Sequence, residues 1–146
     1  MRDTVELLLA KGDFDALREL IRPMKMDDIE SLLLIIAHDE SCISTYSFAN
    51  YMIRITNSPE WHRVAISLML HPFCFLEDAY SVALFHLREI LKVRRTSSEL
   101  YTLLFLYTVA GNVHAAEAHQ VAEELLQEVP NDPVALRILG ETSAGT

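Results

Sequence analysis

Glycine is scarce in this chain, with four residues among 146, and no GxGxxG, GxxxxGK[ST] or GxSxG pattern is present. Loops that cradle phosphate groups or present a nucleophilic serine are built from such patterns. The sequence therefore gives no support to a nucleotide site or a serine hydrolase. The carboxylates also show no spacing that calls for a paired acid and base, so we expect no catalytic residues, no cofactor and no enzymatic activity.

Cysteine is equally rare. Cys42 and Cys74 form no CxxC pair, so they match neither a zinc knuckle nor a redox motif, and we expect buried free thiols. Six histidines are present, but neither HExxH nor ExxH occurs. His114 and His119 are five residues apart and fall on different faces of a helix. We therefore expect no metal site and ordinary core or surface histidines.

The chain also lacks a long uncharged apolar run. The most apolar uncharged stretches, 64–76 and 100–111, are shorter than the roughly 20 residues that a membrane-spanning helix needs. The N-terminal apolar run is brief and is bracketed by Asp3, Glu6 and Lys11, unlike a secretory signal. We therefore expect no membrane partner and a cytoplasmic location.

Apolar side chains are abundant, because hydrophobic residues make up 51% of the sequence. A chain of 146 residues with this composition can bury the core of a single domain, 1–146. The apolar positions recur at helical spacing, and prolines mark most of the breaks. The pattern predicts an all-α fold of about nine helices, near 3–10, 13–22, 27–38, 42–56, 59–70, 76–94, 97–110, 114–129 and 132–140.

The clearest pair of helices lies between residues 96 and 139. Thr96, Ser97 and Ser98 precede Glu99 and an apolar run, and a side-chain oxygen is expected to cap the free N–H groups of a helix that begins there. Gly111 with Asn112 provides the left-handed residue that ends helices. A second helix follows from His114 to Pro130, which indicates two antiparallel helices joined by a tight turn.

This segment resembles a tetratricopeptide repeat, a helical hairpin of about 34 residues. The resemblance rests on YTVAG at 107–111, the small Ala116 and PNDPVAL at 130–136, while Leu104 stands where the repeat has glycine. LLLAKGDFDALREL at 7–20 carries a similar signature. Hairpins starting at residues 27, 59, 97 and 132 would be 32, 38 and 35 residues apart. The resemblance implies antiparallel hairpins stacked as a short right-handed solenoid, whose groove binds proteins.

Positive charge is absent from two long blocks of this acidic chain, which has a net charge of -9. No Lys or Arg lies between Met26 and Ile53 or between Thr96 and Leu136, although the first block holds five carboxylates and the second six. Such carboxylates repel one another and attract a basic protein, whereas the phosphates of nucleic acid would be repelled. A solvated acidic face kept for solubility is the alternative. Lys92, Arg94 and Arg95, the one basic cluster, are expected to cap a helix end.

The stretch HPFCFLEDAY, residues 71–80, crowds aromatic rings into a predicted turn. Phe73, Phe75 and Tyr80 either fold inward as a plug or stay exposed as anchors for a partner. We expect the plug, with Glu77 and Asp78 accessible beside it at the start of the next helix.

Together, the first block, the turn and the start of the second block give eight candidate partner-binding residues. These are Asp27, Asp28, Glu30, Asp39, Glu40, Glu77, Asp78 and Glu99.

HPFCFLEDAYSVALFHLREIL at 71–91, followed by EVPNDPVALRIL at 128–139, is similar to small tetratricopeptide-like proteins of bacterial toxin and immunity loci. This resemblance implies an immunity protein that binds a cognate basic toxin domain, such as a nuclease, one to one and occludes its active site. Two other functions stay open. One is a chaperone that holds a segment of a secreted protein, and the other is a scaffold subunit of a larger assembly.

Overall fold

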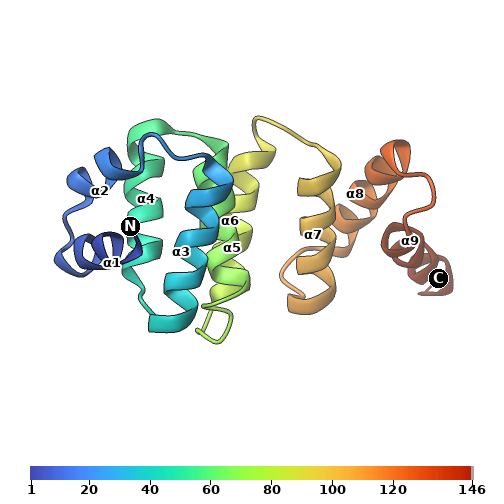
Figure 1. Ribbon diagram of the computed structural model, residues 1–146. Coiled ribbons are helices and arrows are strands. Elements are labelled where there is room, and N and C mark those ends of the chain that lie inside the picture. Colours follow the sequence, from blue (N-terminus) through green and yellow to red (C-terminus); the bar gives the residue numbers. More distant parts are fainter. Residues whose placement is uncertain (146) are drawn as a thin grey trace. The chain divides into compact units, whose positions relative to one another are not determined.

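The computed structural model describes residues 1–145, with side chains through residue 141. Over that range the chain is helical and contains no strand, so the predicted all-α fold of about nine helices is confirmed (Figure 1). The helices are α1 (Arg2–Lys11), α2 (Phe14–Ile21), α3 (Met26–Glu40), α4 (Ser44–Thr56), α5 (Pro59–Leu70), α6 (Ala79–Leu91), α7 (Ser97–Ala110), α8 (Ala115–Glu128) and α9 (Pro133–Gly145). None of the described helices combines the length and apolar character that crossing a bilayer requires.

The chain divides into two compact units, Met1–His86 and Leu87–Thr146. The N-terminal unit contains α1 to α5 and most of α6, and the C-terminal unit contains the end of α6 and α7 to α9. Each unit has its own buried apolar side chains, and each is described by itself below.

In the N-terminal unit, α1 packs on α2, α3 and α4, while α5 packs on α3 and α4. The centre of this core is the fully buried ring of Phe48. The rings of Phe14 and Trp61 meet it edge to face at centroid distances of 5.4 and 5.6 Å, and Tyr51 stacks at 6.0 Å. Aromatic pairs in these geometries stabilise a core beyond the area that they bury.

In the C-terminal unit, α7 packs on α8 and α8 packs on α9, in the order of the chain (Figure 1). Leu100, Leu103 and Leu104 of α7 are fully buried, as are Ala118 and Ala122 of α8. The small side chains of α8 let the leucines of α7 approach closely. This is the helical hairpin that the apolar spacing predicted for residues 97–129.

Most helix ends follow from identifiable residues. Gly12, with φ of +69°, ends α1, and the Asp13 carboxylate then accepts a hydrogen bond from the Ala16 N–H, 3.3 Å away, at the start of α2. The Ser58 hydroxyl accepts from the Glu60 N–H at 3.2 Å and so caps α5. Gly111, with φ of +64°, ends α7 as predicted. The left-handed conformation at these ends is the one that glycine adopts at little cost.

Three boundaries differ from the prediction by three residues or more. Instead of 76–94, α6 spans Ala79–Leu91, and α9 ends at Gly145 instead of residue 140. The sequence had placed Glu77 and Asp78 inside the helix that α6 forms. Asp78 has φ of +64°, a left-handed conformation that an α-helix cannot contain. Residues 71–78 therefore form one irregular turn between α5 and α6.

Candidate functional site

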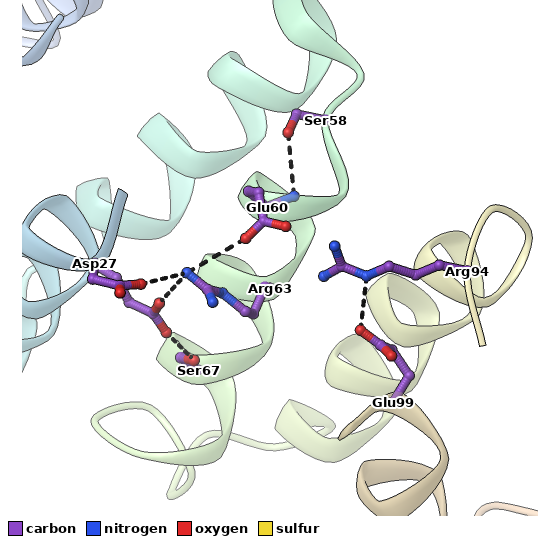
Figure 2. Close-up of polar contacts among 8 residues, drawn as sticks. Asp27, Ser58, Glu60, Arg63, Ser67, Arg94 and Glu99 are labelled. Atoms are coloured by element: carbon purple, nitrogen blue, oxygen red, sulfur yellow. Dashed lines mark hydrogen bonds and ion pairs between the residues drawn. The ribbon is translucent and has the colours of Figure 1, made fainter. Parts of the chain in front are cut away.

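The first candidate carboxylates lie at the N-terminal end of α3, where Arg63 of α5 joins them (Figure 2). Its Nη2 atom is 3.2 Å from Asp27 Oδ1, 3.0 Å from Glu30 Oε2 and 3.5 Å from Glu60 Oε2. The Ser67 hydroxyl also donates to Glu30 at 2.6 Å. The Arg63 guanidinium thus pairs with three carboxylates, so Asp27 and Glu30 are not unpaired.

Asp39, near the end of α3, is paired with the N-terminal helix. The Arg2 Nη2 atom lies 2.9 Å from Asp39 Oδ2, and Arg2 Nε lies 2.7 Å from Glu6 Oε1. Both hydrogen bonds raise the pKa of Arg2, with Glu6 contributing the larger effect. Asp39 is therefore not an unpaired carboxylate.

Glu99, the one candidate in the C-terminal unit, is a structural residue. Only 7% of it is exposed. Its carboxylate accepts a hydrogen bond from Arg94 Nε at 2.8 Å (Figure 2). It also accepts from the Thr96 N–H at 3.0 Å and from the Thr96 hydroxyl. Burial raises the pKa of Glu99, but the hydrogen bonds from Thr96 and Arg94 outweigh it and hold the pKa below its ordinary value. This carboxylate caps α7 and is not accessible to a partner.

Two further carboxylates of the second acidic block, Glu117 and Glu124, are likewise partnered. Arg88 donates two hydrogen bonds to Glu117, of 2.7 and 2.9 Å, and Arg95 donates two to Glu124, of 3.0 and 2.9 Å. The paired hydrogen bonds lower the pKa of Glu117 and raise that of Arg88. In the basic cluster, Arg95 therefore forms an ion pair with α8 instead of only capping a helix end.

The expectation of unpaired acidic blocks was therefore wrong for six carboxylates, namely Asp27, Glu30, Asp39, Glu99, Glu117 and Glu124. The reason is geometric. Their arginine partners lie outside the blocks in the sequence, but helix packing or a turn brings them within 4 Å. A count of charges along the chain does not contain this information.

The other four candidate carboxylates form no ion pair or hydrogen bond with the side chains that the structure describes. They are Asp28, Glu40, Glu77 and Asp78, and all four are exposed. Asp28 opens α3 and Glu40 closes it, whereas Glu77 and Asp78 stand in the turn before α6. The accessibility expected for Glu77 and Asp78 is confirmed.

The turn at 71–78 divides its aromatic side chains between core and solvent. Phe73 is 1% exposed, as a plug requires, but Phe75 is 69% exposed and Leu76 39%. The plug prediction is thus confirmed for Phe73 and wrong for Phe75. Cys74, expected to be buried, is exposed as well. An exposed phenylalanine followed by an exposed leucine is a potential anchor for a partner protein.

A hollow of about 260 Å³ lies between the same turn and α3. Its lining includes His71 and Pro72 of the turn and Leu34, Ile35, His38 and Asp39 of α3. Ile35 is 49% exposed. The apolar run at 32–36 could have indicated such a residue, because five consecutive apolar positions cover more than one face of a helix.

This hollow places the C-terminal part of α3 beside the turn at 71–78, and we call a set of exposed residues from these two segments the acidic turn surface. It comprises Ile35, Glu40, Phe75, Leu76, Glu77 and Asp78. Apolar side chains are exposed here, and the carboxylates carry no partner among the described residues. Such a combination is suited to an apolar and basic segment of another protein.

Two of the histidines, His62 and His86, belong to a buried polar network. His62 Nδ1 lies 2.9 Å from His86 Nδ1, and the Tyr46 hydroxyl lies 2.8 Å from His86 Nε2. His62 is 7% exposed and His86 1%. Within the described part of the chain, no group of three or more His, Cys, Asp or Glu side chains is arranged to hold a metal ion.

No protein-family model, curated protein or solved structure matches the chain.

Proposed function

We propose that this protein is a binding module for a basic protein, and that the partner docks on the acidic turn surface. The observation that carries this proposal is the exposure of Phe75 and Leu76 directly beside Glu77 and Asp78, which have no partner among the described residues. A partly apolar contact supplies binding free energy when an aromatic ring enters a pocket of the partner. Unpaired carboxylates around it favour a cationic partner and speed its association.

The more specific form of the proposal is an immunity protein that neutralises a cognate toxin domain in the bacterial cytoplasm. It is supported by the resemblance of residues 71–91 to small tetratricopeptide-like proteins of toxin and immunity loci, since this stretch also supplies the exposed turn. In this form one copy of the chain binds one basic toxin domain and inhibits it by covering its active site.

The eight candidate residues are expected to contribute unequally to binding. Glu77, Asp78 and Glu40 belong to the acidic turn surface and have no ion pair, so they should dominate the attraction. Asp27, Asp28 and Glu30 lie toward the other end of α3, and Asp39 is paired with Arg2, so these four should contribute less. Glu99 should contribute nothing, because it is buried against Arg94 and Thr96.

The test is affinity capture from the native host with three tagged proteins, followed by identification of the captured proteins by mass spectrometry. The proteins are the wild type, the double variant Glu77→Lys with Asp78→Lys, and a matched control, Glu123→Lys with Glu128→Lys. The control changes the net charge equally at two exposed positions of α8 that have no ion pair among the described residues. We expect the wild type and the control to retain a basic protein that the first variant loses.

The captured protein is then expressed with and without the wild-type chain, and the association rate is measured by stopped flow at low and high salt. We expect growth arrest that the wild type relieves, and an association rate that Glu77→Lys with Asp78→Lys lowers about tenfold at low salt. Equal rates for both double variants would contradict a role for the acidic turn surface. Capture of a harmless secreted protein would favour the chaperone function instead.

A further inference from the structure

A second hollow of the N-terminal unit, separate from the acidic turn surface, has a volume of about 370 Å³. It opens where α2, the turn after it, α3, α4 and α5 converge. This volume lies within the range of small-molecule sites, about 300 to 1,000 Å³. We call it the methionine hollow, because three of the five methionines of the chain line it.

The floor and walls of the methionine hollow are apolar. They consist of Ile21, Met24, Met26, Ile29, Met52 and Trp61. Trp61, Met52, Ile29 and Ile21 are each less than 8% exposed and form the fixed part of the lining. Methionine side chains are flexible and polarizable, so the remainder can adapt to the shape of an apolar ligand.

Arg18 and Arg22 complete the lining. Arg18 forms no ion pair with the described side chains. Its side chain instead hydrogen-bonds to the Tyr51 hydroxyl, which itself donates to Asp15. Arg22 is paired with Glu19 at 2.6 Å, but both side chains are at least 60% exposed, so exchanging this pair for another anion costs little.

This arrangement is unusual for so acidic a chain. Two cations stand at an apolar hollow, and only one carboxylate, that of Glu19, is paired with either of them. A guanidinium binds a carboxylate with two parallel hydrogen bonds when the two groups meet edge to edge. The apolar walls would hold a hydrocarbon chain attached to that carboxylate.

We propose that the methionine hollow binds a monocarboxylate with an unbranched apolar tail. The tail lies against Trp61 and the methionines, and the carboxylate replaces the Tyr51 hydroxyl at Arg18 and Glu19 at Arg22. This site is independent of the protein partner proposed above, because it uses none of the residues of the acidic turn surface.

Trp61 makes the test direct, because it is the single tryptophan of the chain and part of the lining. The wild-type protein is titrated with hexanoate, octanoate and decanoate below their micelle concentrations, and Trp61 emission is recorded. Octanol and octylammonium serve as ligands with the same tail and a neutral or positive head. We expect a saturable change with octanoate or decanoate, about tenfold weaker binding of octanol, and no binding of octylammonium.

Three variants test which side chains bind the carboxylate of the ligand. Arg18→Gln should weaken binding about tenfold, as expected for a lost hydrogen bond to a charged group. Glu19→Gln should strengthen it about twofold by releasing Arg22. Arg54→Gln, at an exposed arginine of α4 outside the hollow, should leave the affinity unchanged.

The proposal is overturned if octanoate and octanol bind with equal affinity, or if no ligand of the series changes Trp61 emission saturably. It is also overturned if Arg18→Gln and Arg54→Gln, both shown to be folded by circular dichroism, bind octanoate as the wild type does. The ligand series requires no variant, so it decides the question even if Arg18→Gln does not fold.

Discussion

Replacement of Glu99 should destabilise the C-terminal unit strongly, although the residue is a carboxylate in an acidic block. Glu99→Ala leaves the Thr96 N–H without its acceptor and removes the hydrogen bond that Arg94 Nε donates to Glu99. Loss of a helix cap costs about 1 kcal/mol, and loss of a buried charged hydrogen bond about 1.5 to 3 kcal/mol. The Arg94 side chain is 36% exposed and can be hydrated in the variant. We therefore expect the free energy of unfolding to fall by about 2 to 3 kcal/mol in total.

Glu99→Gln separates the two contributions. An amide oxygen can still accept the Thr96 N–H, but it has no charge to pair with Arg94, so we expect a loss of about 1 kcal/mol. Glu123→Ala is the matched control, because Glu123 is exposed on α8 without an ion pair among the described side chains. Its effect should stay within about 0.5 kcal/mol. The measurement is urea unfolding followed by circular dichroism at pH 7, since Trp61 lies outside this unit.

The pH dependence of the same variants gives an independent check. The pKa of Glu99 is lowered in the folded protein, so its contribution is complete above the ordinary glutamate pKa of about 4.3. That contribution is lost as the pH falls through the lowered folded pKa. The difference in unfolding free energy between the wild type and Glu99→Gln should therefore shrink as the pH falls below about 4.3. A difference that grows on acidification, or a Glu99→Ala variant as stable as the wild type, would refute this account of the α7 cap.

Three further predictions concern the core, a turn and an ion pair. Phe48→Ala should lower the free energy of unfolding by about 3 to 5 kcal/mol, whereas Phe75→Ala, at a ring that is 69% exposed, should change it by less than about 0.5 kcal/mol in the same urea titration. Gly111→Ala should lower the free energy of unfolding by about 1 to 2 kcal/mol because φ at this residue is +64°, although the space around the new methyl group is open. A loss near zero in thermal unfolding would contradict this prediction. A double-mutant cycle of Arg88→Gln and Glu117→Gln should give a coupling of about 0.5 to 1 kcal/mol at pH 7, a modest value because both side chains are about one third or more exposed. Since the pKa of Glu117 is lowered in the folded state, that coupling should decline as the pH falls below the ordinary glutamate pKa of about 4.3, and a coupling that grows on acidification would argue against the pair.

The helices could be predicted well from sequence because their ends are set by local chemistry. Pro59 fits the first turn of α5 and Gly111 supplies a left-handed end to α7, so both boundaries fall where the sequence placed them. The prediction failed at Asp78. Aspartate is common at helix starts, so the sequence placed Asp78 at the start of the helix, but this residue has a left-handed φ. A local pattern cannot choose between these two conformations.

The candidate site could be predicted only in part. The stretch 71–78 was identified from its crowded aromatic side chains, and Glu77 and Asp78 are accessible as expected. However, Phe73 and Phe75 are two residues apart in the same turn and have opposite fates, one in the core and one in solvent. No periodicity applies inside an irregular turn, so only the folded chain could assign the two rings.

The sequence by itself determined that this protein is helical, where most of its helices begin and end, and that it carries an excess of carboxylates. These properties follow from apolar spacing, capping residues and composition, which act over a few neighbouring positions. Only the tertiary structure decided which carboxylates are neutralised and which residues line a hollow. Arg63 reaches Asp27 across 36 positions of sequence, and the methionine hollow draws on four helices and the turn after α2, because packing brings together side chains that are far apart along the chain.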